Sequence, residues 1–146
     1  MLYIASDHAG YTLRVKIEKY LQNIGIPFNS QGAKSSNEAD NYAEIGAEVC
    51  PQITEEDRLI LICGSGIGIS IIANRFSHIR AGLVHTAKQV QIARAHNNIN
   101  AMVLAGRTTP FWKTRKMITT FLVTEYEKGR HEPRINTLSK YGTHNN

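Results

Sequence analysis

The segment LILICGSGIGIS at residues 59–70 constrains the fold of this chain more than any other. The apolar run RLILIC at residues 58–63 is typical of a parallel strand that is covered on both faces. Three glycines follow within five positions, and a helical pattern begins near Ile67. A buried strand that opens through a glycine loop into a helix predicts the central unit of an α/β sheet.

The same alternation of strand and helix recurs along the 146 residues. We expect strands at residues 2–6, 26–30, 58–63, 80–84 and 101–105. We expect helices at residues 13–24, from Tyr42 to just before Pro51 and from Ile67 onward. Two more helices have a predicted N-cap: one runs from Thr86 to His96, and one starts at an N-cap Thr109 with Pro110 in its first turn and runs to about Lys128. One more short helix is expected in the tail. This order predicts a single domain over residues 1–146: a three-layer α/β/α, Rossmann-like fold with a five-stranded parallel sheet and a C-terminal helical extension.

Composition excludes several classes of protein. No apolar run approaches the roughly 20 residues that span a bilayer, and the start MLYIASDHAG does not read as a signal peptide, so we expect a cytoplasmic protein with no membrane partner. Cys50 and Cys63 belong to no CxxC pair and to no Cys/His cluster with zinc spacing. The sequence therefore predicts neither a disulfide framework nor a metal site.

The positive charge of the chain is unevenly distributed. The formal net charge is +5, and the stretch between Asp57 and Glu125 contains nine Lys or Arg and no Asp or Glu. This stretch favours an anionic ligand and offers no carboxylate as a general base. A nucleic-acid-binding domain needs exposed aromatic residues among its cations, whereas most aromatics here fall at helical core spacing, so we expect no nucleic-acid partner.

Ligands of parallel α/β sheets bind beyond the carboxyl ends of the strands, which directs attention to the loops SDHAG, CGSGIG, VHTA and AGRTTP. The glycine loop does not fit a dinucleotide site, because Ile69 stands where GxGxxG requires a small residue, and no Lys follows as in a Walker loop. Two interpretations remain: a nest of backbone N–H groups for an oxyanion or phosphate, or a tight turn without a ligand.

Single residues in these loops are equally open to two interpretations. A cysteine at the end of an apolar strand, such as Cys63, is usually an inert small hydrophobe, but beside a helix N-terminus a thiol ionises readily and acts as a base or nucleophile. His96 and Asn97 end a predicted helix, where a capping role is the alternative to a site. Arg130 and Arg134 belong to a solvated tail or grip one phosphate from one face of a turn.

Five motifs in order carry a resemblance to a known family. They are SDHAG at residues 6–10, ICGSGIGIS at 62–70, ARAHNN at 93–98, AGRT at 105–108 and GRHEPR at 129–134. Together they resemble the type B ribose-5-phosphate isomerase family, which includes galactose-6-phosphate and allose-6-phosphate isomerases. The resemblance covers essentially the full chain. It implies interconversion of D-ribose 5-phosphate and D-ribulose 5-phosphate in the pentose phosphate pathway, without a metal or organic cofactor.

The resemblance also implies roles for individual residues. Cys63 would move a proton between C2 and C1 of the sugar, while Ser65 and the amides of the loop would stabilise the enediolate. His96 would help to open the furanose ring. The remaining expected contacts are the amides of Gly64, Gly66 and Gly68 at the enediolate, Asp7 and Asn97 at sugar hydroxyls, Tyr42 near the reacting end, His8 and Arg107 at the phosphate, and Arg130 and Arg134 at the phosphate from a second subunit. The expected assembly is a homodimer, or a dimer of dimers, with shared active sites.

The chain can be compared with the family pattern at the base position and in the segment EADNYA at residues 38–43. Some members have glycine in place of this cysteine and a glutamate base six positions later, where this chain has Ile69, so it resembles the cysteine branch. Where the family often shows D-Y-P-x-Y-A, this chain has EADNYA, which keeps Tyr42 and loses the earlier Tyr and Pro. The changed loop leaves a hexose-phosphate isomerase, of allose 6-phosphate or galactose 6-phosphate, as one alternative. A non-catalytic phosphosugar-binding module is the other, since it would need the arginines and the glycine loop but not Cys63 or His96.

Overall fold

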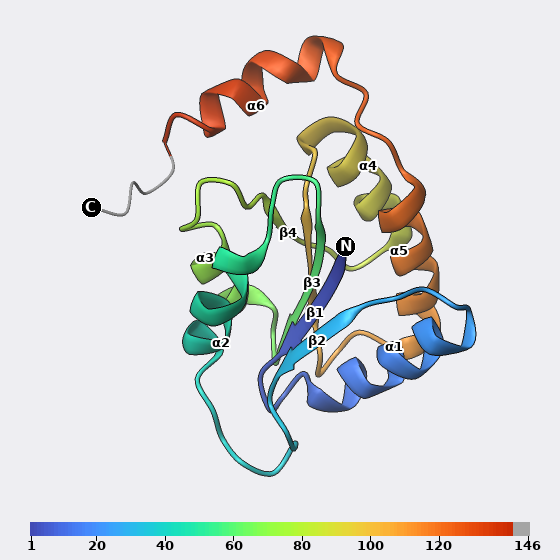
Figure 1. Cartoon of the computed structure of the whole chain (residues 1–146). Helices are drawn as coiled ribbons and strands as arrows, with labels where there is room; N and C mark the ends of the chain where they lie inside the picture. Colours follow the sequence, from blue (N-terminus) through green and yellow to red (C-terminus); the bar gives the residue numbers. More distant parts are fainter. Residues whose placement is uncertain (142–146) are drawn as a thin grey trace.

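The computed structural model describes residues 1–141, which contain one sheet of five parallel strands (Figure 1). The strands are β1 (Leu2–Ser6), β2 (Asn29–Gly32), β3 (Arg58–Cys63), β4 (Ala81–Leu83) and β5 (Ala101–Ala105). They lie in the order β2-β1-β3-β5-β4: β2 lies beyond β1 on one side, and on the other side the chain passes from β3 to the edge strand β4 and returns to β5 between them. The crevice beyond the carboxyl ends of β1 and β3 is therefore a switch point, where ligands of such sheets bind.

Helices cover both faces of the sheet. In the described part of the chain they are α1 (Tyr11–Asn23), α2 (Tyr42–Val49), α3 (Ile67–Ala73), α4 (Ala87–Asn97), α5 (Phe111–Val123) and α6 (Glu132–Leu138), with 3-10 turns η1 (Cys50–Gln52) and η2 (Gly129–His131). Helices α1, α4 and α5 pack on one face and α2 and α3 on the other, while α6 stands apart at the C-terminal end (Figure 1). The predicted three-layer α/β/α fold with a helical extension is confirmed.

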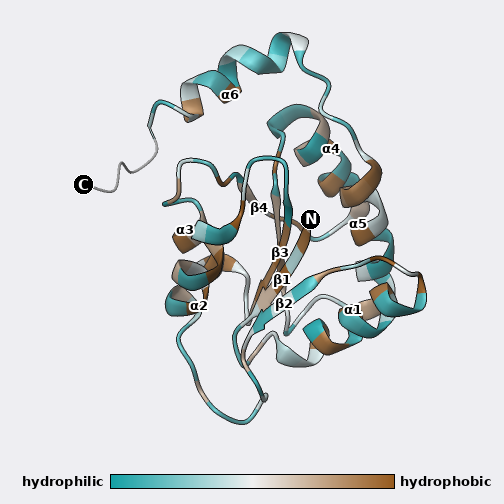
Figure 2. Cartoon of the chain, in the orientation of Figure 1, coloured by the Kyte–Doolittle hydropathy of each residue, from teal (hydrophilic) through white to brown (hydrophobic). Residues whose placement is uncertain are grey.

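The central strand β3 supplies the middle of the core. Ile60 and Ile62 pack against the layer of α1, α4 and α5, while Leu59, Leu61 and Cys63 pack against the layer of α2 and α3. This alternation is the period of two that a strand imposes on its side chains. In Figure 2 the central strands are coloured mostly as hydrophobic, β2 at the edge as hydrophilic, and the helices carry residues of both kinds. The Cys63 side chain therefore faces the α2 and α3 layer.

Register brings the ends of the central strands to one edge. Ser6 of β1 lies opposite Ile62 of β3, and Cys63 lies opposite Ala105 of β5. The loops that follow these three strands start side by side, so residues far apart in the sequence meet at this carboxyl edge.

The second strand begins later than residues 26–30, where the sequence predicts it. Pro27 has no amide hydrogen to donate to a sheet, and Ile26 and Phe28 pack against the core from outside the strand. The polar residues of β2 pair with β1 instead, at the edge of the sheet. The buried guanidinium of Arg14 donates hydrogen bonds to the carbonyl groups of Gln31 and Ala33 and holds this edge in place.

The prediction that Thr109 caps the last long helix was wrong. The N-cap is Pro110, and no side chain caps the helix. Thr109 is buried, and its amide donates to the carbonyl of Ala105, so it closes the turn after β5 instead.

The same helix ends at Val123 and not near Lys128. Two hydrogen bonds hold the segment that follows against α4: Arg94 Nε donates to the carbonyl of Thr124 at 3.2 Å, and the amide of Glu127 donates to the carbonyl of Ala95 at 3.0 Å. These contacts compete with further helical turns. Within residues 1–141, no helix has the length and apolar character that crossing a membrane requires.

Candidate active site

A depression of about 470 Å³ opens at the carboxyl edge, beside the ends of β1, β3 and β5. It brings together eight of the residues expected at the site and four others. The expected ones are Asp7, His8, Tyr42, Cys63, Gly64, Ser65, Gly68 and Arg107, and the others are Ala9, Asp40, Ile67 and Ile71. The loop residues and the cysteine that the sequence singled out therefore share one pocket.

Backbone hydrogen bonds tie the three loops of this edge to one another. The amide of Asp7 donates to the carbonyl of Ile62 at 3.2 Å, and the amide of Gly106 donates to the carbonyl of Cys63 at 2.8 Å. The amide of Arg107 then donates to the carbonyl of Gly64 at 3.2 Å. These bonds continue the sheet past its last residues, so the functional side chains start from a rigid base.

The glycine loop is shaped by close contacts that larger residues would break. Gly66 adopts φ +77°, and a Cβ built on it would lie 2.5 Å from the Leu83 side chain. Gly66 is buried and is absent from the lining of the depression, so it shapes the loop and does not face the pocket. A Cβ at Gly68 would lie 2.5 Å from the ring of Tyr42, which places that ring directly over the start of α3.

The two cysteines differ in their surroundings. Cys63 is 3% exposed and lines the depression. Cys50 is fully buried behind α2, and burial raises its thiol pKa to about 12. A thiol with that pKa does not ionise near neutrality, so Cys50 is not a candidate base.

Acidic groups concentrate at one side of the depression. Asp7 is buried, and its Oδ1 accepts a hydrogen bond from the amide of Gly10 at 2.9 Å. Burial raises the pKa of Asp7 above its ordinary value, and the negative charge of Asp40 raises it further. Asp40 itself contacts His8, with 2.8 Å between its Oδ1 and the ring Nδ1. Sequence reasoning missed Asp40, although it stands where EADNYA departs from the family pattern.

The other four expected residues lie outside this depression. His96 and Asn97 end α4, which runs back from the carboxyl edge to the amino end of β5 (Figure 1). Arg130 and Arg134 are exposed in η2 and α6, which follow α5 at the same end. Within one chain, these four residues and Cys63 lie at opposite edges of the sheet.

The second group has its own geometry, centred on His96. The rings of His96 and His131 stack with centroids 4.2 Å apart and 13° between their planes. Glu127 Oε2 lies 3.7 Å from Nε2 of His96 and 3.6 Å from Nε2 of His131. Burial lowers the pKa of His131, and the positive charges of His96 and Arg130 lower it further. Sequence reasoning missed His131 and Glu127 as partners of His96.

Two groups of side chains in the described residues have the composition of a metal site: Asp7, His8 and Asp40, and His96, Glu127 and His131. In the second, the imidazole planes are nearly parallel, so their in-plane lone pairs do not converge on one ion without rotation of a ring. In the first, Nδ1 of His8 is already engaged with Asp40.

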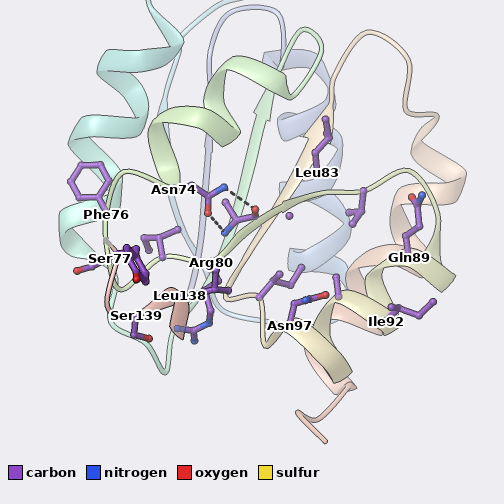
Figure 3. Close-up of a pocket in the computed structure, with 17 residues that line it drawn as sticks. Asn74, Phe76, Ser77, Arg80, Leu83, Gln89, Ile92, Asn97, Leu138 and Ser139 are labelled. Atoms are coloured by element: carbon purple, nitrogen blue, oxygen red, sulfur yellow. Dashed lines mark hydrogen bonds between the residues drawn. The ribbon is translucent and has the colours of Figure 1, made fainter. Parts of the chain in front are cut away.

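A larger hollow of about 610 Å³ lies along β4, and its lining does not include Cys63 (Figure 3). Its lining is mostly apolar and includes Leu83, Ile92 and Leu138, and Asn97 is among its polar residues. Asn74 closes part of the strand edge, because its side chain exchanges two hydrogen bonds with the backbone of Ala81. Among residues 1–141, the lining of this hollow contains Arg80 but no Asp, Glu, His or Cys, whereas the smaller depression holds Asp7, His8 and Cys63, so the smaller depression is the candidate active site.

Comparison of the sequence with protein families gives one full-length match. The profile of the family described as Ribose/Galactose Isomerase matches residues 2–138. Ribose-5-phosphate isomerase B of Escherichia coli is 33% identical over 135 residues, which cover 91% of this chain and 90% of that protein. A putative sugar phosphate isomerase of Bacillus subtilis is 34% identical over 140 residues, which cover 94% of each chain.

Solved structures agree with these matches. A ribose 5-phosphate isomerase from Thermotoga maritima superposes with a TM-score of 0.91 at 39% identity, and covers 95% of this chain and 97% of its own. Ribose-5-phosphate isomerase B from Mycoplasma genitalium, solved with bound ribulose-5-phosphate, superposes with a TM-score of 0.89 at 31% identity over 96% of this chain and 94% of its own.

Proposed function

Because the chain belongs to the Ribose/Galactose Isomerase family, we propose that it is a single-domain aldose-ketose isomerase that interconverts D-ribose 5-phosphate and D-ribulose 5-phosphate. One observation carries the proposal: Cys63 lines the same depression as the glycine loop, Tyr42 and Arg107. A base, a row of amides and a cation then lie within reach of one small phosphorylated sugar.

The proposed reaction is a proton transfer through an enediolate. The Cys63 thiolate takes the proton from C2 of the open-chain aldose, and the electron pair of that C–H bond forms the C1–C2 double bond while charge moves onto O1. The thiol returns the proton to C1 while the O2 proton passes to O1, so that O2 becomes the carbonyl oxygen of the ketose, O1 becomes a hydroxyl group and the thiolate is regenerated. Hydrogen moves as a proton throughout, so the reaction requires no metal or organic cofactor.

The glycine loop is suited to the charge that develops on the sugar oxygens. Amides of the first turn of a helix have no acceptor within the helix, and α3 starts at Ile67 directly after the loop. Ser65 Oγ accepts a hydrogen bond from the amide of Ile67 at 3.3 Å, and Ser65 lines the depression. We assign Ser65 and the amides of residues 64–68 to the enediolate, where one such donor contributes about 10²-fold or more to the rate.

The phosphate requires more positive charge than one copy of the depression holds. Arg107 lies against Gly64, whose built Cβ would be 3.0 Å from its guanidinium, but Asp7 and Asp40 line the same space. A phosphate dianion beside two carboxylates needs further cations. We propose that Arg130 and Arg134 of a second copy supply them, with Arg107 and His8 from the first.

The same assembly would complete the sugar end of the site. We propose that His96 and Asn97 of the second copy reach the depression, where His96 helps to open the furanose ring and Asn97 and Asp7 hold hydroxyl groups. The hollow along β4, which Asn97 helps to line, supports a paired arrangement, because the exposed side chains of Leu138 and Tyr141 also line it. The expected assembly is a homodimer or a dimer of dimers.

A hexose 6-phosphate is the second candidate substrate, in an isomerase of the same chemistry. The loop over residues 33–41, which carries Asp40 over the depression, departs from the family pattern, and it borders the space that a longer sugar would fill. Selection against one extra carbon amounts to only about 1 to 3 kcal/mol, so measured rates must decide. As part of the proposal we place the enzyme in the cytoplasm and in the pentose phosphate pathway.

The test compares ribose 5-phosphate, allose 6-phosphate and galactose 6-phosphate with wild type and Cys63→Ala, in the presence of a chelator. We expect turnover of ribose 5-phosphate by wild type and a loss of at least about 10²-fold in the variant. Turnover of a hexose phosphate alone would select the second candidate. No turnover of any substrate, with phosphosugar binding retained, would leave a binding module, and full activity of Cys63→Ala would overturn the thiol base.

A further inference from the structure

Asp40 and His8 form a close pair at the mouth of the candidate site. Asp40 lies in the loop between β2 and α2, while His8 follows β1. Oδ1 of Asp40 accepts the backbone amide of His8 at 2.9 Å and lies 2.8 Å from Nδ1 of its ring. One carboxylate oxygen therefore contacts both the backbone amide and the ring of His8.

This geometry locates a proton. A carboxylate oxygen has no hydrogen to donate, so a contact of 2.8 Å requires that Nδ1 of His8 carries the hydrogen. The amide of Asp40 also lies 3.3 Å from Nδ1, but a protonated Nδ1 cannot accept from it. The shorter contact decides between the two, since two lone pairs at 2.8 Å would repel each other. The ring is thus held with Nδ1 toward Asp40.

Nε2 is then the ring atom left for a ligand. No hydrogen bond to Nε2 of His8 occurs in the part of the chain that the structure describes, and His8 and Asp40 both line the depression that holds Cys63. Side-chain exposure of 28% for His8 and 26% for Asp40 keeps the pair accessible to a substrate while most of it is enclosed.

We propose that Asp40 is a positioning residue, which fixes the ring of His8 so that Nε2 meets the phosphate group of the substrate. The inference rests on the proposed function and deepens it. With Nδ1 committed, the ring donates from Nε2 only when both nitrogens carry hydrogen, and a phosphate oxygen is the partner that selects this form. The neutral pair of carboxylate and imidazolium then orients the phosphate while Arg107 supplies net charge.

The pair is a feature of this chain and not of the pattern D-Y-P-x-Y-A. In EADNYA, Asp40 stands at the position of the proline in that pattern, and a proline side chain accepts no hydrogen bond. At this position the loop therefore contacts His8 through a carboxylate, which a proline could not provide.

The first test reads the proton directly and does not depend on turnover. In ¹⁵N-labelled protein, two-bond ¹H–¹⁵N spectra distinguish the two neutral tautomers of His8, whose signals are assigned from their loss in His8→Gln. We expect hydrogen on Nδ1 in wild type and in Asp40→Asn, whose amide oxygen still accepts, and a shift toward the Nε2–H tautomer in Asp40→Ala. An Nε2–H tautomer in wild type would overturn the inference even if the enzyme is fully active.

The second test separates positioning from a general effect on the loop. We expect Asp40→Ala to raise the KM for ribose 5-phosphate by about 10-fold with a smaller change in kcat. Asp40→Asn should keep the KM close to that of wild type, because its amide oxygen still accepts the hydrogen bond. In a His8→Ala background, Asp40→Ala should cost nothing further, because its effect passes through His8. Glu38→Ala, which removes a charge from the same exposed loop, serves as the matched control and should leave KM unchanged.

Additive losses in the double variant would overturn the inference, as would an equal loss in Glu38→Ala. If wild type turns over no sugar phosphate, the proposed function fails. The spectra of His8, recorded with and without added inorganic phosphate, still decide whether Asp40 positions His8 for an anion. A phosphate-dependent change of the His8 signals in wild type and its absence in Asp40→Ala support the inference in that case.

Discussion

The rings of His96 and His131 stack 4.2 Å apart, at the edge of the sheet opposite to Cys63. The stack gathers Arg130 and Arg134 around the end of α4, because both arginines flank His131 in η2 and α6. A site that uses this cluster together with Cys63 needs two chains.

Mixing inactive chains tests the shared site. Cys63→Ala removes the proposed base from one edge, and Arg134→Ala removes a proposed phosphate ligand from the other. We expect each variant alone to be at least about 10²-fold less active, and a mixture that has exchanged subunits to regain up to about a quarter of wild-type activity. The measurement is ribose 5-phosphate turnover before and after dissociation and reassembly.

A mixture that stays as inactive as its parents would contradict a site built from two copies. Each variant mixed with itself through the same cycle is the control, since it shows what reassembly alone does to activity.

Selective alkylation distinguishes the two cysteines. Iodoacetamide at pH 8 should modify Cys63 and leave Cys50 intact, because Cys50 is fully buried and its pKa of about 12 leaves almost no thiolate. Ribulose 5-phosphate should slow the reaction of Cys63 by filling the depression in front of it. Peptide mass spectrometry reads both sites in one experiment. Equal labelling of the two thiols, or no protection by the sugar, would argue against the assigned pocket.

Asp7→Asn should stabilise the protein while it impairs activity. Burial raises the pKa of Asp7 above 3.8, so the native state holds this proton more tightly than the unfolded chain. The protonated carboxyl group of Asp7 therefore stabilises the folded state at low pH, and this contribution is lost as the pH rises through the raised pKa. The asparagine variant should have the higher Tm at pH 7, and the difference should shrink as the pH falls toward 3.8.

The activity of the same variant should fall by about 10-fold or more, because Asp7 is assigned to a sugar hydroxyl. Thermal unfolding over a series of pH values, with turnover at pH 7, checks both parts. A higher Tm for wild type than for Asp7→Asn at pH 7 would contradict the predicted direction of the stability change.

Gly68→Ala should damage activity more than stability. The new methyl group would meet the Tyr42 ring at 2.5 Å, but this ring is 44% exposed and can move away. Alanine is also favoured over glycine within a helix by about 1 kcal/mol. We expect kcat/KM to fall by about 10-fold to 100-fold, since Tyr42 leaves its place over the glycine loop.

Gly46→Ala provides the matched control for this clash. Its methyl group would meet the Ile72 side chain at the same distance of 2.5 Å, between α2 and α3 and outside the depression. This variant should lose stability and keep its kcat/KM. The opposite result for the pair, with Gly68→Ala active and Gly46→Ala inactive, would refute the role of Tyr42.

Arg94 should be essential for stability. It is 2% exposed, and its guanidinium donates to Thr124, Asn98 and Ile99, which joins the ends of α4 and α5. Burial lowers its pKa to about 10, and the charge of Arg58 contributes to this shift. Arg94→Met should reduce the free energy of unfolding by about 3 kcal/mol, because several acceptors lose their donor at once.

Chemical denaturation measures this loss, and Arg94→Lys should recover little of it, since one ammonium group cannot reproduce the planar guanidinium fork. The exposed Arg75 is the control, and Arg75→Ala should change stability by less than about 0.5 kcal/mol. A loss for Arg94→Met no larger than that of the control would contradict the structural role.

The layered fold was predictable because its signals are local. The apolar run at residues 58–63 became β3 without a change in its bounds, and Thr86 accepts the amide of Gln89 at 3.1 Å as its spacing predicts. The end of α5 was not predictable, because it depends on Arg94 and Glu127 reaching across to a different helix. Such contacts between distant residues leave no periodic trace in a sequence.

The candidate site divides in the same way. Asp7 directly follows β1 and Cys63 ends β3, so the parallel topology brings both to the same edge of the sheet. Asp40 lies in an irregular loop, where nothing in the sequence predicts the direction of a side chain. His96 was expected at the site, but the direction of α4 carries it to the other edge, which only the three-dimensional arrangement reveals.

The separation of Cys63 and His96 to opposite edges of one sheet has an evolutionary consequence. If each active site draws one edge from each chain, a duplicated gene can diverge by complementary loss. One copy can keep the thiol edge and discard the arginines, while the other does the reverse. The pair would then retain one working site and have an obligatory heteromeric assembly, and the freed edge of each copy would become open to a new ligand.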